Sequence, residues 1–338
     1  MELSLASHEL KNVWSRTKEI FSGVLSVFGD AVEKVNISEI GITLRSGLNR
    51  GNWRDRGNEL FQILASAEKP ILLLMDEVPL MINRMLKGDE FAITPERRAA
   101  VDEFMSWLRD ISIRHQGRIH IIMSGSIGFE PVLHQAGLSA AINNFWPFQL
   151  KPWDQETTLA CLRALSNEYG IEFETGAAME IVARLGCCIP HHVQTFFAHV
   201  YERCRRGKCA RASVDDVREV YENEMLGIRG HAELTHYEER LKLVLGPDTF
   251  PLALEMLTEA AVVGQVSRET LAFLQNTYDF GARKPESVQE EILRVLEHDG
   301  YLKNTENGYS FESRLLRDWW KKRYGFFYTP VGKRGVVK

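Results

Sequence analysis

The spacing of apolar residues predicts alternating helices and short strands over the first half of the chain. Apolar residues at intervals of three and four predict an amphipathic helix within residues 1–35. The short, uninterrupted apolar run at 71–75 (ILLLM) predicts a strand buried on both faces of a parallel sheet, and 118–124 (RIHIIMS) predicts a second buried strand. The segment 145–150 (FWPFQL) predicts a third short strand. Helices are predicted between these strands, at 57–68 and 96–116. Strands separated by helices indicate an α/β fold.

The second half of the chain has a helical pattern that ends in a hairpin. Helices are predicted at 154–169, 176–186, 190–206 and 213–226. The polar stretch 227–240 (GIRGHAELTHYEER) predicts a linker, after which helices are predicted near 238–246, 250–262, 267–274 and 286–299. In the following GYLKNTENGYSFES, apolar residues flank the turn TENG and predict a β-hairpin. Helices followed by a two-stranded wing are typical of a winged-helix domain.

Composition and charge exclude several classes of protein. The chain has 338 residues, 44% of them hydrophobic, with 41 Lys and Arg against 46 Asp and Glu and a net charge of −5. This apolar content excludes a disordered chain, and the length suggests two or three domains. The longest apolar run has five residues, far short of the roughly 20 that cross a bilayer, so no membrane partner is expected. No secretory signal is visible, and five cysteines form no disulfide framework, so a cytoplasmic protein is expected.

Polar side chains end both predicted strands and are the first candidates for chemistry. Asp76 and Glu77 follow the first apolar run, and Ser124 and Ser126 end the second. The carboxyl ends of parallel strands are where α/β proteins bind ligands. In nucleoside triphosphatases, an Asp at this place holds Mg²⁺, directly or through water, and a Glu polarises the attacking water. The alternative is that the acids meet solvent or cap the next helix, and that the serines also cap a helix.

The order of these segments resembles a known family. ILLLMDEVPLMI, FMSWLRDI, IHIIMSGSIGFEPVL and AAINNFWPFQLKPW resemble, in that order, the AAA+/STAND-like archaeal-type ATPases, which are P-loop NTPases. The segment GCCIPHHVQTF is similar to the turn of that family's lid, through Gly186, Pro190 and Gln194. YSFESRLLRDWWKKR is similar to its closing winged-helix segment. The resemblance covers about residues 57–324.

The resemblance implies a nucleotide-dependent molecular switch that uses ATP and Mg²⁺. Asp76 would be the Walker B acid that holds Mg²⁺ through water, and Glu77 the catalytic base. Ser124 or Ser126 would be the sensor group, and Pro190 would belong to the nucleotide-facing turn of the lid. The arginine that stabilises the charge developing on the phosphates could be Arg118, Arg114 or Arg109. The alternative for each of them is an ordinary solvated side chain on a helix or loop.

One motif of the family is missing from this sequence. No G-x-x-x-x-G-K-[ST] occurs in the 338 residues, and the Gly-Lys steps at 207–208 and 332–333 have neither the first Gly nor a following Ser or Thr. Such a loop supplies the backbone N–H groups and the Lys that cradle phosphates. We therefore expect a family member that lacks its N-terminal portion, through truncation, a downstream start or evolutionary loss. Such a chain is expected to bind ATP poorly. The missing strand is central in the family, so its loss would expose sheet edges.

These interpretations divide the chain into four parts. They are an incomplete P-loop NTPase-type α/β core (1–152), an α-helical lid (153–228), a winged-helix domain (238–326) and a basic tail (327–338). One alternative is a non-catalytic adaptor that binds DNA or protein through the winged helix. Another is that the chain is one half of an ATPase and that a separate P-loop polypeptide completes it. A further possible partner is a second copy of the same chain, in a homo-oligomer.

Two other groups of residues have both a functional and a purely structural interpretation. Residues 314–338 hold eight Lys or Arg among aromatic residues and could contact phosphates, although Trp319 and Trp320 are expected to pack the last helix. The adjacent cysteines and histidines of 187–192 are awkward zinc ligands because zinc sites prefer spaced cysteines, so helical packing is expected there.

Overall fold

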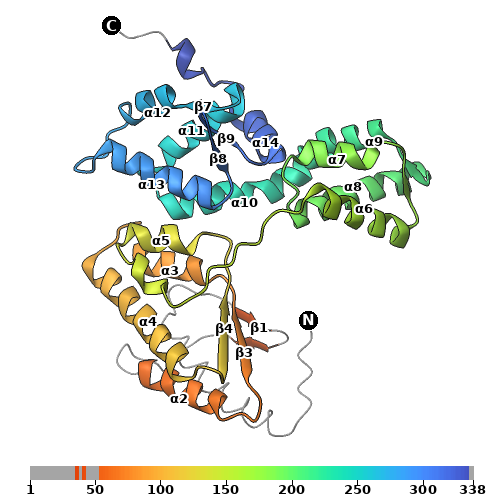
Figure 1. The fold of residues 1–338 in the computed structure, drawn as a ribbon. Helices are drawn as coiled ribbons and strands as arrows, with labels where there is room; N and C mark the ends of the chain where they lie inside the picture. The colour runs from red at the N-terminus through yellow and green to blue at the C-terminus, as the bar shows by residue number, and fades with distance from the viewer. Residues whose placement is uncertain (1–34, 38–39, 43–52, 335–338) are drawn as a thin grey trace. The chain divides into compact units, whose positions relative to one another are not determined.

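The computed structural model describes residues 35–37, 40–42 and 53–334. Residues 1–34, which hold the predicted N-terminal helix, lie outside the described residues. The chain divides into two compact units, residues 1–146 and 147–338, and each is described by itself (Figure 1). Among the described residues, every helix is too short or too polar to span a bilayer.

The first unit is built on two parallel strands, as the apolar runs predict. β3 (Ile71–Met75) pairs with β4 (Ile119–Met123) in register, so that Ile71 lies opposite Ile119 and Met75 opposite Met123. The helices of this unit are α2 (Trp53–Ala65), α3 (Val78–Lys87), α4 (Pro95–Arg114) and α5 (Phe129–Gln135), followed by the 3₁₀ turn Ser139–Ile142. A short antiparallel pair, β1 (Val35–Ile37) and β2 (Ile40–Ile42), precedes them. A small parallel sheet with helices confirms the predicted mixed α/β class for this unit.

The core of the first unit lies along α4. Its apolar face, predicted from the sequence, is buried in full, since Val101, Phe104, Met105, Leu108 and Ile111 are each at most 4% exposed. Thr94 begins the helix by accepting a hydrogen bond from the backbone N–H of Arg97. Against this face, α2 adds a cluster of aromatic rings around Trp107, whose Nε1 donates to Asn58 Oδ1 at 3.0 Å.

Two predictions about the sheet are wrong. The first is that β3 is buried on both faces, because exposure alternates along it: Leu72 is 55% exposed and Leu74 is 62% exposed. Ile122 of β4, opposite Leu74, is 53% exposed on the same face. The second is the strand at 145–150, where no strand forms and Trp146, Phe148 and Leu150 are each more than 80% exposed. A strand needs a neighbour for its backbone groups, and within the described residues β4 pairs with β3 alone.

The second unit begins with a block of helices, here called the helical block (residues 153–227). It contains α6 (Gln155–Tyr169), α7 (Ala177–Leu185), α8 (Pro190–Gly207), α9 (Val214–Val220) and a π-helical turn (Tyr221–Met225). The short strands β5 (Glu172–Phe173) and β6 (Arg211–Ala212) pair in parallel. Local capping explains where helices start: Asp154 caps α6, and Ser213 with Asp216 forms a reciprocal capping box at α9. The helices predicted over 154–226 are confirmed.

The rest of the second unit is here called the hairpin block. It contains α10 (Ile228–Leu245), α11 (Phe250–Val263), β7 (Val266–Ser267), α12 (Arg268–Gln275), α13 (Pro285–His298), β8 (Leu302–Thr305), β9 (Gly308–Phe311) and α14 (Arg314–Tyr324). Its strands form an antiparallel sheet in the order β7, β9, β8, so the predicted hairpin is confirmed. The packing of Trp319 and Trp320 into the core is also confirmed, since they are 1% and 0% exposed.

The predicted linker over 227–240 is wrong, because α10 runs through it. Its apolar residues are few, but Leu234 and Leu241 are buried, and so is the acidic Glu238. Glu238 lies 2.8 Å from Arg323 of α14 and 2.5 Å from Lys242, which compensates its burial. The helix is therefore held by partners far away in the sequence, which a local polar pattern does not reveal.

Candidate functional site

The structure brings together four of the site residues predicted from the sequence. Because β3 and β4 are parallel and in register, the residues after Met75 and Met123 meet at one edge of the sheet. Ser124 Oγ donates a hydrogen bond of 2.6 Å to Asp76 Oδ1. Ser126 donates to Glu77 Oε2 twice, from Oγ at 3.0 Å and from the backbone N–H at 3.3 Å. Each acid of β3 is thus fixed by one serine that follows β4.

The serines leave one oxygen of each acid free. Asp76 Oδ1 accepts both the Ser124 hydroxyl and the backbone N–H of Glu77, the latter at 3.0 Å. Within the described residues, no hydrogen bond is recorded to Asp76 Oδ2 or to Glu77 Oε1. Asp76 is exposed and Glu77 is half-buried. The site therefore offers two oriented carboxylates, each with an oxygen still able to bind a ligand.

Glu77 has a backbone conformation that L-residues rarely adopt. Its φ of 57° and ψ of 27° are left-handed, and it stands at the start of α3 without capping the helix through its side chain. The turn is closed by a hydrogen bond from the Val78 N–H to the Ser124 carbonyl at 3.2 Å. Gly125 fits because a Cβ there would lie 2.6 Å from Pro79 Cδ. A left-handed turn thus directs the Glu77 side chain toward Ser126, and such strain is concentrated at functional sites.

The donor set suits a hard divalent cation. Mg²⁺ prefers oxygen ligands and is commonly held by one or two carboxylates together with waters and substrate phosphates. The free oxygen of Asp76 and the hydroxyl of Ser124 match that preference. No group of three or more His, Cys, Asp or Glu that could hold a metal occurs among the described residues. A metal here would accordingly need ligands from a phosphate or from water.

The structure does not bring the candidate arginines to these acids. Arg118 precedes β4, about 20 Å of strand away from Ser124, and its guanidinium donates to the backbone carbonyls of Ala65 (3.1 Å) and Ala67 near the end of α2. Arg114 pairs with Asp110 on α4 at 2.5 Å. Arg109 is an exposed residue of the same helix. Within the first unit, Arg118 therefore acts as a cap for chain carbonyls.

Pro190 belongs to the second unit, where it begins α8. Gly186 of the same turn has a φ of 69°, and a Cβ there would lie 2.8 Å from Arg314 Cβ of α14. Gln194 is exposed on α8. This turn therefore joins the helical block to the hairpin block, and that packing accounts for Gly186.

The neighbouring cysteines and histidines are packing residues of the helical block. Cys188 and His192 are each 5% exposed, and burial raises the pKa of the Cys187 thiol to about 11. Burial, together with the charge of His191, lowers the pKa of His192 to about 4. His231 lies in the stretch 227–240 that was predicted to be a linker, but it is part of α10 and accepts a hydrogen bond of 3.1 Å from Trp319 Nε1.

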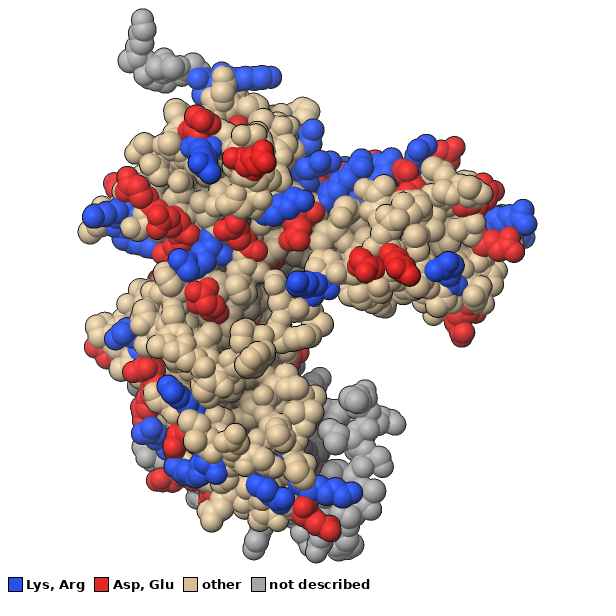
Figure 2. Space-filling model, viewed as in Figure 1, with Lys and Arg blue, Asp and Glu red and all other residues tan. Residues whose placement is uncertain are grey.

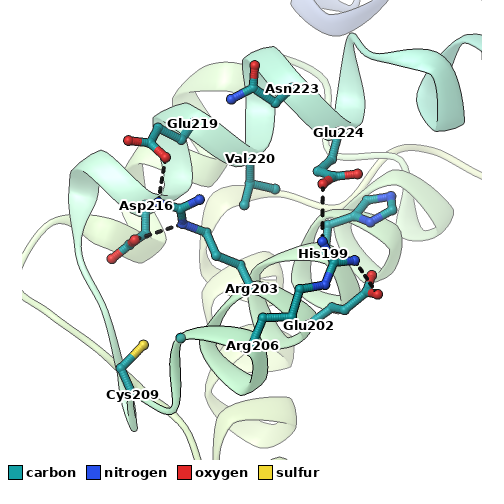
Figure 3. A pocket seen from close by; sticks show the side chains of 11 residues that line it. His199, Glu202, Arg203, Arg206, Cys209, Asp216, Glu219, Val220, Asn223 and Glu224 are labelled. Carbon is teal, nitrogen blue, oxygen red and sulfur yellow. Dashed lines mark hydrogen bonds and ion pairs between the residues drawn. The ribbon is translucent and has the colours of Figure 1, made fainter.

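A cavity of about 380 Å³ lies between α8 and the end of α9, where no candidate was predicted from the sequence (Figure 3). Arg203 crosses it to Asp216 at 2.8 Å and Glu219 at 2.5 Å. Arg206 pairs with Glu202 and lies 4.0 Å from Glu224. The charged groups of the cavity thus satisfy one another and bind the two helices together. The only sequence signal was the Glu202–Arg206 spacing of four, which is common on helices.

Comparisons with known proteins give structural similarity alone. No protein-family model matches the chain, and no curated protein matches it. The chain is similar to the solved structure of a Walker-type ATPase of Pyrococcus abyssi, with 14% identity, 82% of this chain and 72% of that chain covered, and a TM-score of 0.49. It is also similar to the RuvB Holliday junction branch migration motor of Thermotoga maritima, with 17% identity, 75% and 71% covered, and a TM-score of 0.39. At such identities and TM-scores, the function has to be argued from the chain's own residues.

Proposed function

We propose that this chain carries the part of an ATP-dependent molecular switch that holds Mg²⁺ and activates the attacking water. The observation that carries the proposal is the pair of serine–carboxylate contacts at the carboxyl ends of β3 and β4. Solvated strand-end acids would not need partners from the neighbouring strand or a strained turn between them. The 338 residues contain no phosphate-binding loop of the G-x-x-x-x-G-K-[ST] type, so the site is proposed to be one half of a nucleotide site.

Each residue of the site has a distinct proposed role. The free oxygen of Asp76 holds Mg²⁺ through a water, and the free oxygen of Glu77 accepts a proton from the attacking water. Ser124 and Ser126 are positioning residues, because each holds one acid in place by its hydroxyl. When bound, Mg²⁺ offsets the negative charge of the phosphates. Hydrogen bonds fixed in advance need no rearrangement during the reaction, which is how such sites favour it.

The finer assignment of the domains belongs to the same proposal. We infer a P-loop NTPase-type sheet for the first unit, with α6 to α9 as its lid. The order α11, β7, α12, α13, β8, β9 supports a winged helix in the hairpin block, because three helices flank a short sheet that ends in a hairpin. The resemblance of the sequence motifs supports both assignments.

Phosphate release and nucleotide binding by the full chain test the proposal. We expect weak binding of MgATP and hydrolysis close to the buffer rate, because a phosphate cradle supplies most of the binding energy. If the full chain shows Mg²⁺-dependent turnover and Glu77→Gln abolishes it, the role of Glu77 stands, but the proposal that the chain holds only half of a nucleotide site is refuted. Turnover that survives Glu77→Gln would refute the assigned site itself. Asp89→Asn, an exposed acid after α3, is the matched control.

A second candidate is that another polypeptide completes the site. The observation that favours it is the apolar face of the sheet, where Leu72, Leu74 and Ile122 are each more than half exposed. Parallel sheets are almost always covered on both faces. A partner that carries a phosphate-binding loop and the helix after it would cover this face with that helix and supply the missing backbone donors.

Reconstitution distinguishes this second candidate. A G-x-x-x-x-G-K-[ST] polypeptide from the same cells should bind the full chain and restore hydrolysis that depends on Glu77. Leu74→Lys with Ile122→Lys should abolish that binding, whereas Ile228→Lys, at an exposed apolar position in the second unit, should not. Equal binding by both variants, or self-association through this face, would refute completion by a separate chain.

A further inference from the structure

Two phenylalanines occupy the tip of a tight turn directly after α14. The backbone N–H of Tyr328 donates to the Gly325 carbonyl at 3.3 Å, so Phe326 and Phe327 are the central residues of a four-residue turn. Such positions favour Gly, Pro, Asn, Asp and Ser. Phe326 is 85% exposed and Phe327 is 91% exposed, with ring centroids 4.7 Å apart and rings at 89°. They add little to the core, so the fold alone does not explain them.

The structure fixes this turn on both sides. Before it, Tyr324 packs on the fully buried Trp320, with ring centroids 5.5 Å apart. After it, Tyr328 Oη donates to Glu259 Oε2 at 2.7 Å, and the Val331 N–H donates to the same oxygen at 3.1 Å. Glu259 is only 3% exposed, and the pKa of Tyr328 is raised by its own burial and then by its hydrogen bond to Glu259. The two rings are therefore held out from a rigid support, which lowers the entropic cost of binding.

Lysines without a recorded ion pair stand before and after the turn in the sequence. Lys321 and Lys333 are exposed, and no ion pair is recorded for either of them in the described part of the chain. Lys322 donates to a backbone carbonyl at 3.2 Å, which leaves its charge uncompensated. By contrast, Arg323 and Arg334 pair with buried or half-buried glutamates at 2.8 Å and 2.5 Å. Figure 2 marks Lys and Arg in blue, and on the visible face they lie among acidic side chains, which are drawn in red.

These features fit a polyanion that carries flat, exposed rings. Unpaired nucleobases stack on aromatic side chains whatever their sequence, because every base has a π-face, and the phosphates between them are drawn to lysines. In a duplex the base faces are already covered. Two rings offer a small apolar area to a bilayer, and an apolar protein pocket would not require the lysines.

We propose that Phe326 and Phe327, with Lys321 and Lys333, form a binding site for single-stranded nucleic acid. The rings stack against unpaired bases, and the lysines contact the phosphates on either side. Arg323 is excluded from this site, although it is one of the basic residues of 314–338, because its guanidinium is committed to Glu238. The site is independent of the acids at β3 and β4, so it stands or falls separately from the proposed ATP-dependent switch.

Fluorescence anisotropy with the full chain and a labelled single-stranded DNA of about 20 nucleotides tests the site, since this length exceeds the roughly 4–16 nucleotides that one OB fold covers. We expect Phe326→Ala and Phe327→Ala each to weaken binding by about 5- to 150-fold. Lys321→Ala and Lys333→Ala should each lower the slope of log affinity against log salt by about 0.7. The matched controls Phe273→Ala and Lys284→Ala, at exposed positions of α12 and before α13, should leave both values unchanged.

Cross-linking gives a readout that does not depend on any variant. A strand containing 5-iodouracil, irradiated with the unaltered protein, should cross-link to the peptide that contains Phe326 and Phe327. The proposal is overturned if cross-links form elsewhere, if duplex of the same length binds as tightly, or if the phenylalanine variants bind as the unaltered chain does. It is also overturned if vesicles rich in phosphatidylserine are bound through these phenylalanines while the single strand is not.

Discussion

The left-handed conformation of Glu77 predicts an unusual preference for glycine at this position. We compare Glu77→Gly with Glu77→Ala, because both variants lose the hydrogen bonds from Ser126 and differ in how they tolerate a φ of 57°. A Cβ in the left-handed region costs roughly 1–2 kcal/mol, and glycine avoids that cost. Glycine also differs from alanine in unfolded-chain entropy and in capping preference, and both effects must be removed by a control.

Lys284 supplies the matched control. It also stands at the start of a helix, without a side-chain cap, but its φ of −70° and ψ of 129° are ordinary extended values. The preference for glycine over alanine at 77 should therefore exceed that at 284 by about 1–2 kcal/mol, which is the cost of the strain alone. Hydrogen exchange of the surrounding amides in the full chain measures each opening free energy, and 1.4 kcal/mol corresponds to a tenfold change. Equal preferences at the two positions would refute a strained Glu77.

Two further predictions concern packing and pH. Gly125→Ala places a Cβ 2.6 Å from Pro79 Cδ and should destabilise the first unit by about 1–3 kcal/mol in urea unfolding. The control Gly332→Ala, whose Cβ has no atom within 4 Å, should change stability by less than about 0.5 kcal/mol. Equal effects of the two variants would contradict the close approach of Gly125 to Pro79. Because His192 has a pKa of about 4 when folded and of about 6.5 when unfolded, the unfolded chain takes up its proton first, and stability should fall by up to about 3 kcal/mol as the pH drops from 6.5 to 4. His192→Gln should remove this part of the pH dependence, and an unchanged slope would show that another group causes it.

The strands β3 and β4, and the four polar residues that meet where they end, were predictable because their signals are local. Five apolar residues followed by Asp76 and Glu77 specify a strand and its polar end without reference to the rest of the chain. The parallel pairing then places Ser124 opposite Asp76. Which acid each serine would hold was not predictable, because it depends on the left-handed turn at Glu77, and a non-glycine residue gives no sequence sign of that turn.

The errors arose where long-range partners decide the structure. The stretch 227–240 is mostly helical, and its buried Glu238 is compensated by an ion pair with Arg323, which stands 85 positions later in the sequence. The apolar segment 145–150 satisfies the local pattern of a strand but forms none among the described residues. The turn at Phe326 was hidden in the sequence for a different reason: a run of aromatic residues does not show which rings are buried, as Trp320 is, and which are exposed.

Binding of Mn²⁺ to the full chain, followed by NMR, tests the proposed metal site at Asp76. Mn²⁺ substitutes for Mg²⁺ and broadens the signals of nearby backbone amides. We expect broadening centred on residues 75–78 and 123–126 that excess Mg²⁺ reverses and Asp76→Asn abolishes, while Asp89→Asn leaves it unchanged. Broadening elsewhere, or broadening at these residues that persists in Asp76→Asn, would contradict a metal site at the ends of β3 and β4.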